Sequence, residues 1–450
     1  MALIIVAILL AGYLLIATES FTQVNKAAVV IFACTAGWVL YVSYGTNFVM
    51  QQHPSEYLDY LKGAESTSVT VKEFIASNVF LKYVGKASEI VLFLLATMTI
   101  VEILDNNGCL DFIPQLLKTR NGKRILWTLS VVTLLISVNL DNFTTTLMML
   151  VIMRKIIPNR RQRMIFGSAI VVAANCGGVM TVIGDPTGLM LWNNGFVSAT
   201  HYSMTLVIPC IVAWLVPTLW LSRCVPTRVE TEWIAMPYRG DDTRLNVWQR
   251  LLMLFVGIGG LWFIPTFHNI TKLSPFLGAL CVLGVLWVVN EAFNRKLMNM
   301  DAMERRRMPQ ALFYGNHQLI LFVMGTILAL GVVKETGILT RFWEAMQSMA
   351  VADWMLGLCA GAISSVLDNF VTAATFISVN PSTEMNAAYW NLVAYGAAIG
   401  GNVLAIGSVA GMTLMKTERI HMGWYFKNVG GMAALGAVMG YMILVLILYI

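Results

Sequence analysis

The stretch Ser137-Val138-Asn139-Leu140-Asp141-Asn142-Phe143-Thr144-Thr145-Thr146 carries the one charged residue of a long apolar run, residues 125–153. A related stretch, Ser364-Ser365-Val366-Leu367-Asp368-Asn369-Phe370-Val371-Thr372, carries the one charged residue of the apolar run 354–379. An ionised carboxylate is costly in such surroundings because it loses its hydration. We therefore interpret the two Leu-Asp-Asn-Phe motifs as two halves of one site inside a membrane.

The composition supports this interpretation. Of the 450 residues, 58% are hydrophobic and only 12% are charged, whereas soluble domains carry about a quarter charged residues. The apolar runs continue for ~20 residues without the alternation of a transmembrane β-barrel, so the sequence predicts an all-α polytopic membrane protein. The net charge of +6 lies mostly in loops and does not indicate a nucleic-acid partner. The seven cysteines form no CxxC pair, which favours small buried residues over a metal site or disulfides.

Eight apolar segments are long enough, alone or with flanking residues, for one crossing each. They are residues 2–17, 27–45, 89–104, 203–222, 248–265, 274–290, 318–333 and 428–450. Four other segments do not fit a single span. We predict hairpins over 125–153 and 354–379, and broken helices over 164–192 and 389–415.

The two broken helices share a glycine pattern. Residues 177–188 and 400–411 both read Gly-Gly-x4-Ile-Gly-x3-Gly. Glycine frees the backbone, and Pro186 removes a hydrogen-bond donor, so both segments are predicted to unwind. Motifs that recur in the same order indicate an internal duplication, with repeats at 1–224 and 248–450 and a cytoplasmic linker at 225–247.

The lysines and arginines predict the orientation. Both ends of 125–153 are basic, which places both on the cytoplasmic side and makes the segment a re-entrant hairpin. Residues 154–163 and 295–307 are predicted to be cytoplasmic, and 193–203 and 380–388 to be outside. The two repeats are then inverted, each with five crossings, one re-entrant hairpin and one broken helix.

The polar residues of these four segments suit a small hard cation. Backbone carbonyls, amide and hydroxyl oxygens and carboxylates are ligands for an ion such as Na⁺, whereas thiolates and imidazoles suit softer metals. Asp141, Asp185 and Asp368 are the predicted Na⁺ ligands, because they are the carboxylates deep in the special segments. The wider cation- and proton-binding set consists of Asn142, Thr144, Thr145, Asn175, Thr187, Asn369, Thr372, Asn402 and Ser408. A proton and Na⁺ that compete for one buried carboxylate provide the simplest antiport mechanism.

Each of these residues could instead have a purely structural role. The aspartates could cap helix N-termini, and Asp185 before Pro186 could merely start a half-helix. Asn175 and Asn402 could join helices by hydrogen bonds. The threonines, Thr375 included, could bond to carbonyls of their own helices.

The motifs resemble those of NhaD-type sodium/proton antiporters. These belong to the ion transporter superfamily, which also holds arsenite permeases and sodium-coupled dicarboxylate and citrate carriers. The matching stretches are Thr97–Glu102, Leu140–Thr146, Ala174–Gly178, Ile183–Asp185, Val366–Asn369 and Ile406–Ser408. The resemblance implies a scaffold and a transport domain, frequent dimerisation, and ion binding at the hairpin tips and helix breaks. The sequence departs from the family pattern at two places. Residues 184–188 read Gly-Asp-Pro-Thr-Gly, where the family tends to read Gly-Asp-Val-Thr-Thr. The family usually has a proline after the Asp-Asn pair of the second tip, but none follows Asp368-Asn369 here.

We therefore expect a multi-pass protein of the inner (plasma) membrane that exchanges Na⁺ or Li⁺ for H⁺, is not an enzyme, needs no cofactor and forms a homodimer. The alternative is a carboxylate, citrate or arsenite transporter on the same fold. Two acidic tips would repel an anion, although charge does not exclude neutral arsenite. An intramembrane aspartyl protease would need its aspartates on ordinary adjacent spans, without duplicated glycine breaks.

Overall fold

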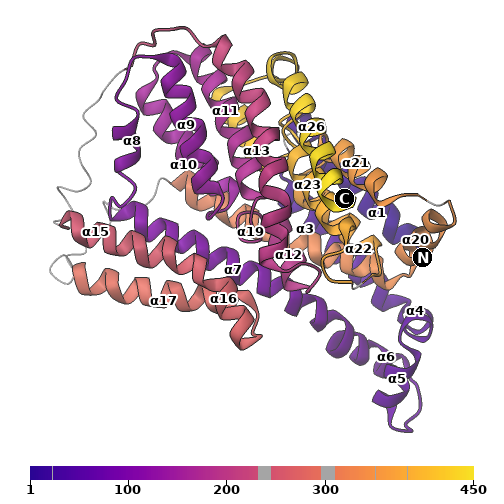
Figure 1. The fold of residues 1–450 in the computed structure, drawn as a ribbon. Coiled ribbons are helices and arrows are strands. Elements are labelled where there is room, and N and C mark those ends of the chain that lie inside the picture. The colour runs from indigo at the N-terminus through magenta and orange to yellow at the C-terminus, as the bar shows by residue number, and fades with distance from the viewer. Residues whose placement is uncertain (23, 232–244, 295–309, 350, 383, 450) are drawn as a thin grey trace.

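The computed structural model describes the whole chain except residues 23, 232–244, 295–309, 350, 383 and 450. The described part is built from helices (Figure 1), and its one β-bridge joins Asn121 to Arg228. Seven helical stretches of the described part are long and apolar enough to cross a membrane. They are Lys26–Ser43, Ser68–Asn106, Ala199–Cys224, Val247–Thr271, Pro275–Phe293, His317–Glu335 and Met422–Tyr449. These helices confirm the predicted class, an all-α polytopic membrane protein.

The first half of the chain runs from the N-terminus to the end of α13. Its helices are α1 (Ala2–Ala17), α2 (Glu19–Thr22), α3 (Lys26–Ser43), α4 (Gly45–Gln52), α5 (Pro54–Leu61), α6 (Ser68–Phe74), the π-helical turn η1 (Ile75–Phe80), α7 (Leu81–Asn106), α8 (Phe112–Leu116), α9 (Gly122–Ser137), α10 (Asn142–Ile156), α11 (Arg160–Gly178), α12 (Pro186–Asn193) and α13 (Ala199–Cys224).

The second half begins at α15. Its helices are α15 (Val247–Leu254), η2 (Phe255–Gly259), α16 (Gly260–Thr271), α17 (Pro275–Asn294), α19 (Gln310–Glu335), α20 (Ile338–Ser348), α21 (Asp353–Ser364), α22 (Asn369–Val379), α23 (Ala388–Gly400), α24 (Val409–Glu418), α25 (Met422–Tyr425), η4 (Phe426–Gly430) and α26 (Gly431–Tyr449). The predicted linker 225–247 lies partly outside the described residues, and the basic segment 295–307 lies entirely outside them.

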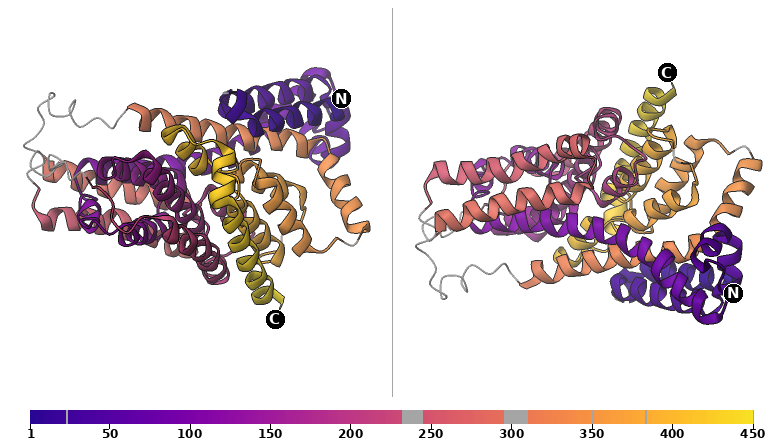
Figure 2. Two further views of the ribbon diagram at one scale, coloured as in Figure 1. Left: turned by 90° about the horizontal axis from the view of Figure 1, so that it is seen from above. Right: turned by 90° about the horizontal axis from the view of Figure 1, so that it is seen from below.

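Helices of the two halves pack in corresponding pairs. Helix α1 packs on α3 as α16 packs on α17, and α3 packs on α19 as α17 packs on α7. In the same way α9 packs on α11 and α21 on α23, while α13 packs on α26 across the two halves. Figures 1 and 2 show α9, α10, α11 and α13 side by side, and the layer of α7, α16 and α17 beside them. Close packing of this kind needs small residues at helix crossings; at Gly325 of α19, for example, an added Cβ would lie 2.9 Å from Val30 of α3.

One predicted span lies within a much longer helical stretch. Residues 89–104 are only the apolar end of a continuous helical stretch, Ser68–Asn106, which includes η1. The charged side chains Lys72, Glu73, Lys82 and Lys86 interrupt the apolar run. They do not interrupt the helix, because lysine and glutamate are good helix formers.

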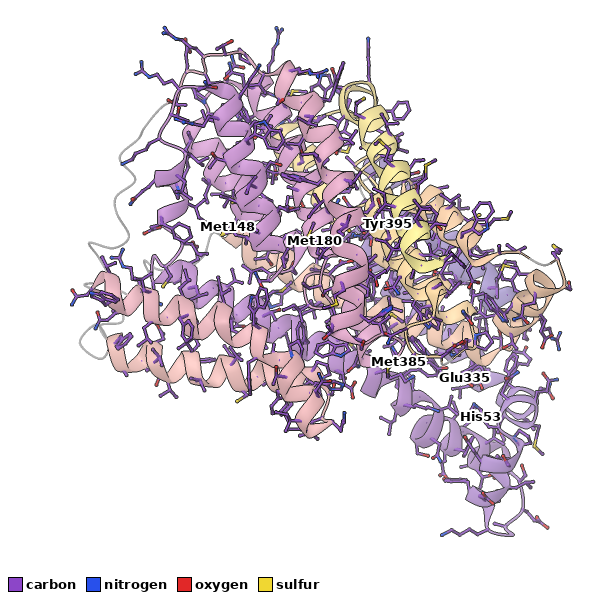
Figure 3. The ribbon with its side chains drawn as sticks, in the orientation of Figure 1. His53, Met148, Met180, Glu335, Met385 and Tyr395 are labelled. Atoms are coloured by element: carbon purple, nitrogen blue, oxygen red, sulfur yellow. The ribbon has the colours of Figure 1, made fainter. Side chains whose placement is uncertain are left out.

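A polar cluster attaches the helices after α3 to the end of α19. His53, between α4 and α5, contacts Glu335 with its Nε2 atom 2.7 Å from Oε2, and the Tyr83 hydroxyl donates to Glu335 Oε1 at 2.7 Å. Figure 3 shows His53 and Glu335 at the same end of the molecule. The hydrogen bond to Glu335, aided by the charges of Glu335 and Glu56, raises the pKa of His53 despite partial burial. The contact therefore holds the short helices α4–α6 against the membrane-spanning bundle.

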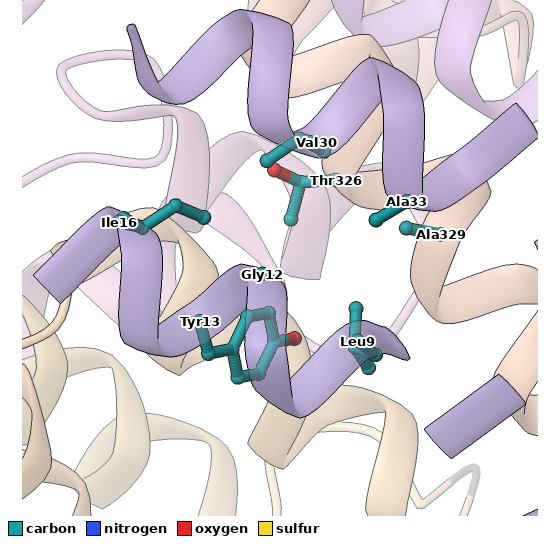
Figure 4. Close-up of a pocket in the computed structure, with 8 residues that line it drawn as sticks. All are labelled: Leu9, Gly12, Tyr13, Ile16, Val30, Ala33, Thr326 and Ala329. Atoms are coloured by element: carbon teal, nitrogen blue, oxygen red, sulfur yellow. The ribbon is translucent and has the colours of Figure 1, made fainter. Parts of the chain in front are cut away.

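A small cavity lies between α1, α3 and α19 (Figure 4). Its lining consists of Leu9, Gly12, Tyr13, Ile16, Val30, Ala33, Thr326 and Ala329. Only Tyr13 and Thr326 bring polar atoms to it, and it includes none of the predicted ion-binding residues. The cavity is therefore an apolar packing defect and not the candidate site.

Candidate functional site

Each Leu-Asp-Asn-Phe motif lies at a turn between two helices. Helix α9 ends at Ser137 and α10 begins at Asn142, with Asp141 as the N-cap residue. Helix α21 ends at Ser364 and α22 begins at Asn369, with Asp368 as the N-cap residue. The two aspartates therefore occupy equivalent positions.

Both aspartates use one carboxylate oxygen as a helix cap. Asp141 Oδ1 accepts from the Thr144 amide at 2.9 Å, and Asp368 Oδ1 accepts from the Phe370 amide at 3.0 Å. The capping interpretation is thus correct for these oxygens. It does not account for the second oxygen, Oδ2, of each carboxylate. Asp141 Oδ2 is buried without a hydrogen-bond partner among the described residues, whereas Asp368 Oδ2 lies 2.5 Å from Lys26 Nζ.

The two glycine-rich segments interrupt their helices where the sequence predicts it. Helix α11 ends at Gly178 and α12 begins at Pro186, while α23 ends at Gly400 and α24 begins at Val409. Asp185 and Ser408 are the equivalent N-cap residues. Ser408 accepts a capping bond from the Gly411 amide at 3.0 Å, whereas the Asp185 side chain accepts none from α12. Asp185 therefore stands at the start of the half-helix, as the capping interpretation has it, but its contact with Thr187 of α12 is not a capping bond of good geometry.

Each interrupted helix lies directly against a hairpin turn. A Cβ atom at Gly184 would lie 2.6 Å from the carbonyl oxygen of Ser137, and a Cβ atom at Gly407 would overlap the carbonyl oxygen of Ser364. The Asn369 amide also donates to the Gly407 carbonyl at 2.9 Å. Only glycine permits this backbone approach, which brings the motifs of hairpin and break together.

We expect Gly407→Ala to destabilise the protein by at least about 1–3 kcal/mol, since the methyl group must displace a buried backbone segment. Exchange should fall with it, because the same backbone positions Asp368 and Ser408. A thermal melt of the purified variant measures the first effect. Gly85→Ala is the matched control, because nothing lies within 4 Å of its added Cβ; equal melting temperatures for the two variants would contradict the prediction.

An amide network links the first hairpin to both helix breaks. Asn142 Nδ2 lies 3.4 Å from both Asp185 Oδ1 and Asn175 Oδ1. Asn175 Nδ2 in turn donates to Asn402 Oδ1 at 2.9 Å and to Ser408 Oγ at 3.0 Å. The interpretation of Asn175 and Asn402 as a link between helices is correct, and the link joins the two halves of the chain at the candidate site.

The threonine hydroxyls of the predicted site differ in their hydrogen bonding from the hydroxyls of two nearby threonines, Thr146 and Thr375. Thr146 and Thr375 donate to carbonyls of their own helices at 2.7 Å. Four other hydroxyls, all buried, have no hydrogen bond of good geometry among the described residues, namely those of Thr144, Thr145, Thr187 and Thr372. Back-bonding therefore accounts for Thr375 but not for these four.

The twelve predicted residues are all buried, with exposures of at most 7%. Their unpartnered atoms include Oδ2 of Asp141 and of Asp185, and both are acceptors that a small cation satisfies. Asp185 also lies within electrostatic range of Asp141 and Asp368. Within the described residues no group of three or more His, Cys, Asp or Glu side chains gathers tightly enough to hold a metal ion. In this conformation the three aspartates thus do not surround a single ion.

Sequence reasoning missed Lys26, which pairs with Asp368. It is the first residue of α3 and comes directly before a predicted span, where a basic residue is unremarkable. Nothing in the linear pattern indicates a partner more than three hundred positions away, so only the packing of α3 against the second half reveals it.

The buried polar site, formed where two helix turns meet two interrupted helices in a polytopic bundle, defines a membrane transporter. The sequence pattern of the family described as "Citrate transporter" matches residues 4–400. The chain therefore belongs to this family, and its relatives place it with the NhaD-type antiporters of the ion transporter superfamily.

Three relatives illustrate the similarity. Sodium/proton antiporter 2 of Arabidopsis thaliana is 31% identical over 367 residues, which are 80% of this chain and 85% of the relative. Sodium/proton antiporter 1 of the same plant is 31% identical over 385 residues, or 84% of this chain and 64% of the relative, so the chain spans less than two thirds of that protein. The Na⁺/H⁺ antiporter NhaD of Vibrio cholerae is 27% identical over 439 residues, or 92% of this chain and 84% of the relative.

Proposed function

We propose that the protein is a secondary transporter that exchanges Na⁺ or Li⁺ for H⁺. The observation that carries the proposal is the pair of buried carboxylate oxygens without a hydrogen-bond partner among the described residues, Asp141 Oδ2 and Asp185 Oδ2. Asn142, the residue after Asp141, lies 3.4 Å from the other oxygen of Asp185, Oδ1. Relatives named as sodium/proton antiporters support the same reaction.

In this mechanism Asp141 and Asp185 supply the negative charge that binds the cation. Nearby hydroxyl oxygens from Thr144, Thr145 and Thr187 replace part of its hydration shell. A proton neutralises the same carboxylates when the cation leaves, so that the site is never both empty and fully charged in a medium of low dielectric constant. Alternate occupation by Na⁺ and H⁺ on opposite sides of the membrane gives exchange.

The family description also raises citrate transport. The unpartnered oxygens oppose it, because two carboxylates in a buried site repel an anion instead of compensating its charge. Purified protein in liposomes that contain a pH-sensitive dye tests both functions. We expect Na⁺ and Li⁺ gradients to move protons, and citrate, arsenite and K⁺ to leave the dye unchanged. Transport driven by citrate alone would contradict the proposal.

We also propose two inverted repeats, 1–224 and 248–450, with re-entrant hairpins at 125–153 and 354–379. The corresponding packing pairs, such as α9 with α11 and α21 with α23, support this arrangement. So do the equivalent N-cap positions of Asp141 and Asp368. Residence in the inner (plasma) membrane and a homodimer complete the proposal and stay predictions.

Inversion predicts that residues 154–163 face the cytoplasm and that 380–388 face outward. We expect a membrane-impermeant thiol reagent, added to intact cells, to modify Met385→Cys but to leave Arg161→Cys unmodified until the cells are opened. Both positions are exposed, and Figure 3 shows Met385 at the end of the molecule where His53 and Glu335 lie. The native cysteines, of which Cys224, Cys281 and Cys359 are exposed, are first replaced by serine. The reverse labelling pattern would overturn the orientation.

A further inference from the structure

The two hairpin tips are equivalent in sequence and in helix geometry, but their charges are not. Asp141 Oδ2 has no partner among the described residues, whereas Asp368 Oδ2 is paired with the Lys26 ammonium. Among the ion pairs of the described residues, this is the one that includes a predicted site carboxylate. The asymmetry therefore lies within the site itself.

The surroundings hold the ammonium in place. Lys26 is 14% exposed and Asp368 is 3% exposed, so water screens the pair weakly. The ammonium also lies 4.2 Å from the ring centroid of Phe322, which adds a cation–π contact. Helix α3 packs on α19, and α19 packs on α22, which Asp368 caps.

The position of Lys26 does not stabilise its own helix. It is the first residue of α3, where the helix dipole is unfavourable for a cation, and Asn25 already caps that end by accepting from the Ala27 amide at 2.8 Å. A cation is disfavoured there unless a partner compensates for it. The compensating partner is Asp368.

We propose that Lys26 is a tethered competitor of the transported cation at the second tip. Its ammonium occupies the place where Na⁺ would otherwise contact Asp368 Oδ2, and it thereby directs the free cation to Asp141 and Asp185. Lys26 is a specificity-determining residue in this scheme, and the inference rests on the proposed exchange of Na⁺. The transported ion gains access to Asp368 only when α22 moves relative to α3 and separates the pair.

The test is Na⁺ binding to purified full-length protein, measured by isothermal titration. Lys26→Gln keeps a hydrogen-bond donor but removes the charge, so we expect the apparent Na⁺ affinity to tighten roughly tenfold or more. Lys26→Arg keeps the charge and should stay within about threefold of the unchanged protein. Damage to the fold would weaken binding, so the direction of the change distinguishes competition from a merely structural role.

A double-variant cycle identifies the partner. In an Asp368→Asn background, Lys26→Gln should no longer tighten Na⁺ binding, because no carboxylate remains for the ammonium to occupy. If Lys26→Gln is unstable without Na⁺, its melting temperature is followed as NaCl is added. Na⁺ should then raise it more than that of the unchanged protein, since bound Na⁺ replaces the missing charge.

The outcomes are distinct. Suppose that the unchanged protein binds and exchanges Na⁺. If Lys26→Gln then binds Na⁺ no more tightly than the unchanged protein, or if added Na⁺ raises the melting temperatures of both proteins equally, the competitor role is wrong and the proposed function stands. If the unchanged protein neither binds nor exchanges Na⁺, the proposed function fails and this inference fails with it. Tightening that persists in the Asp368→Asn background would also overturn it, because Lys26 would then act elsewhere.

Discussion

Asp141→Asn abolishes Na⁺-driven proton movement while the protein still inserts and folds: this is the largest effect that we expect. The substitution removes the unpartnered Oδ2 charge, and the amide oxygen that replaces Oδ1 can still accept from the Thr144 amide and preserve the cap. Loss of a buried charge that pairs with a cation costs ~3–5 kcal/mol, which is a loss of ~10²–10⁴-fold. Exchange in liposomes measures it, and a thermal melt verifies the fold.

Asp368→Asn should abolish exchange as well, and it should also lower the stability of the protein. It leaves the Lys26 ammonium without its carboxylate partner, so the variant should also be less stable than Asp141→Asn. Asp59→Asn, on exposed α5, is the matched control and should behave like the unchanged protein. Near-normal exchange by Asp141→Asn would mean that Asp141 is only a helix cap, and near-normal exchange by Asp368→Asn would mean that Asp368 only caps α22 and pairs with Lys26.

The second large effect is the dependence of Na⁺ affinity on pH. If a proton and Na⁺ compete for one carboxylate, protonation removes the charge that binds Na⁺, and the apparent affinity weakens as pH falls. Below the pKa of that carboxylate the affinity should fall about tenfold per pH unit for each competing proton, which is ~1.4 kcal/mol of linkage. Above that pKa the site is already deprotonated, so the affinity should level off. Isothermal titration with Na⁺ from roughly pH 6 to 9 measures this profile.

Two variants separate the carboxylates in the same experiment. Asp185→Asn should keep part of the pH dependence because Asp141 still titrates, whereas Asp141→Asn should lose Na⁺ binding at every pH. Glu56→Gln is a control outside the bundle, since Glu56 lies on α5 beside His53. A flat affinity with active exchange would show that the proton travels on a group other than the cation ligands.

The candidate site illustrates how far local sequence can lead. Isolated Asp141 and Asp368, and the repeated glycine pattern, point to buried polar atoms because lipid tolerates such groups only for a compensating reason. That reasoning identified the residues that are buried together. It could not separate helix caps from ligands, because it allowed a capping role for all three aspartates, whereas the structure shows capping bonds of good geometry from Asp141 and Asp368 and not from Asp185.

The residues alone were enough to predict the helical membrane class, the turns at the two aspartates and the two helix breaks. These features follow from hydrophobic run length and from glycine and proline chemistry, which act over a few residues. The folded molecule was needed to reveal the continuous Ser68–Asn106 helix, the Asn142–Asn175–Asn402 network and the Lys26–Asp368 pair. The last two depend on which helices pack together. A linear pattern does not encode contacts between residues hundreds of positions apart, because these arise from the packing of the whole bundle.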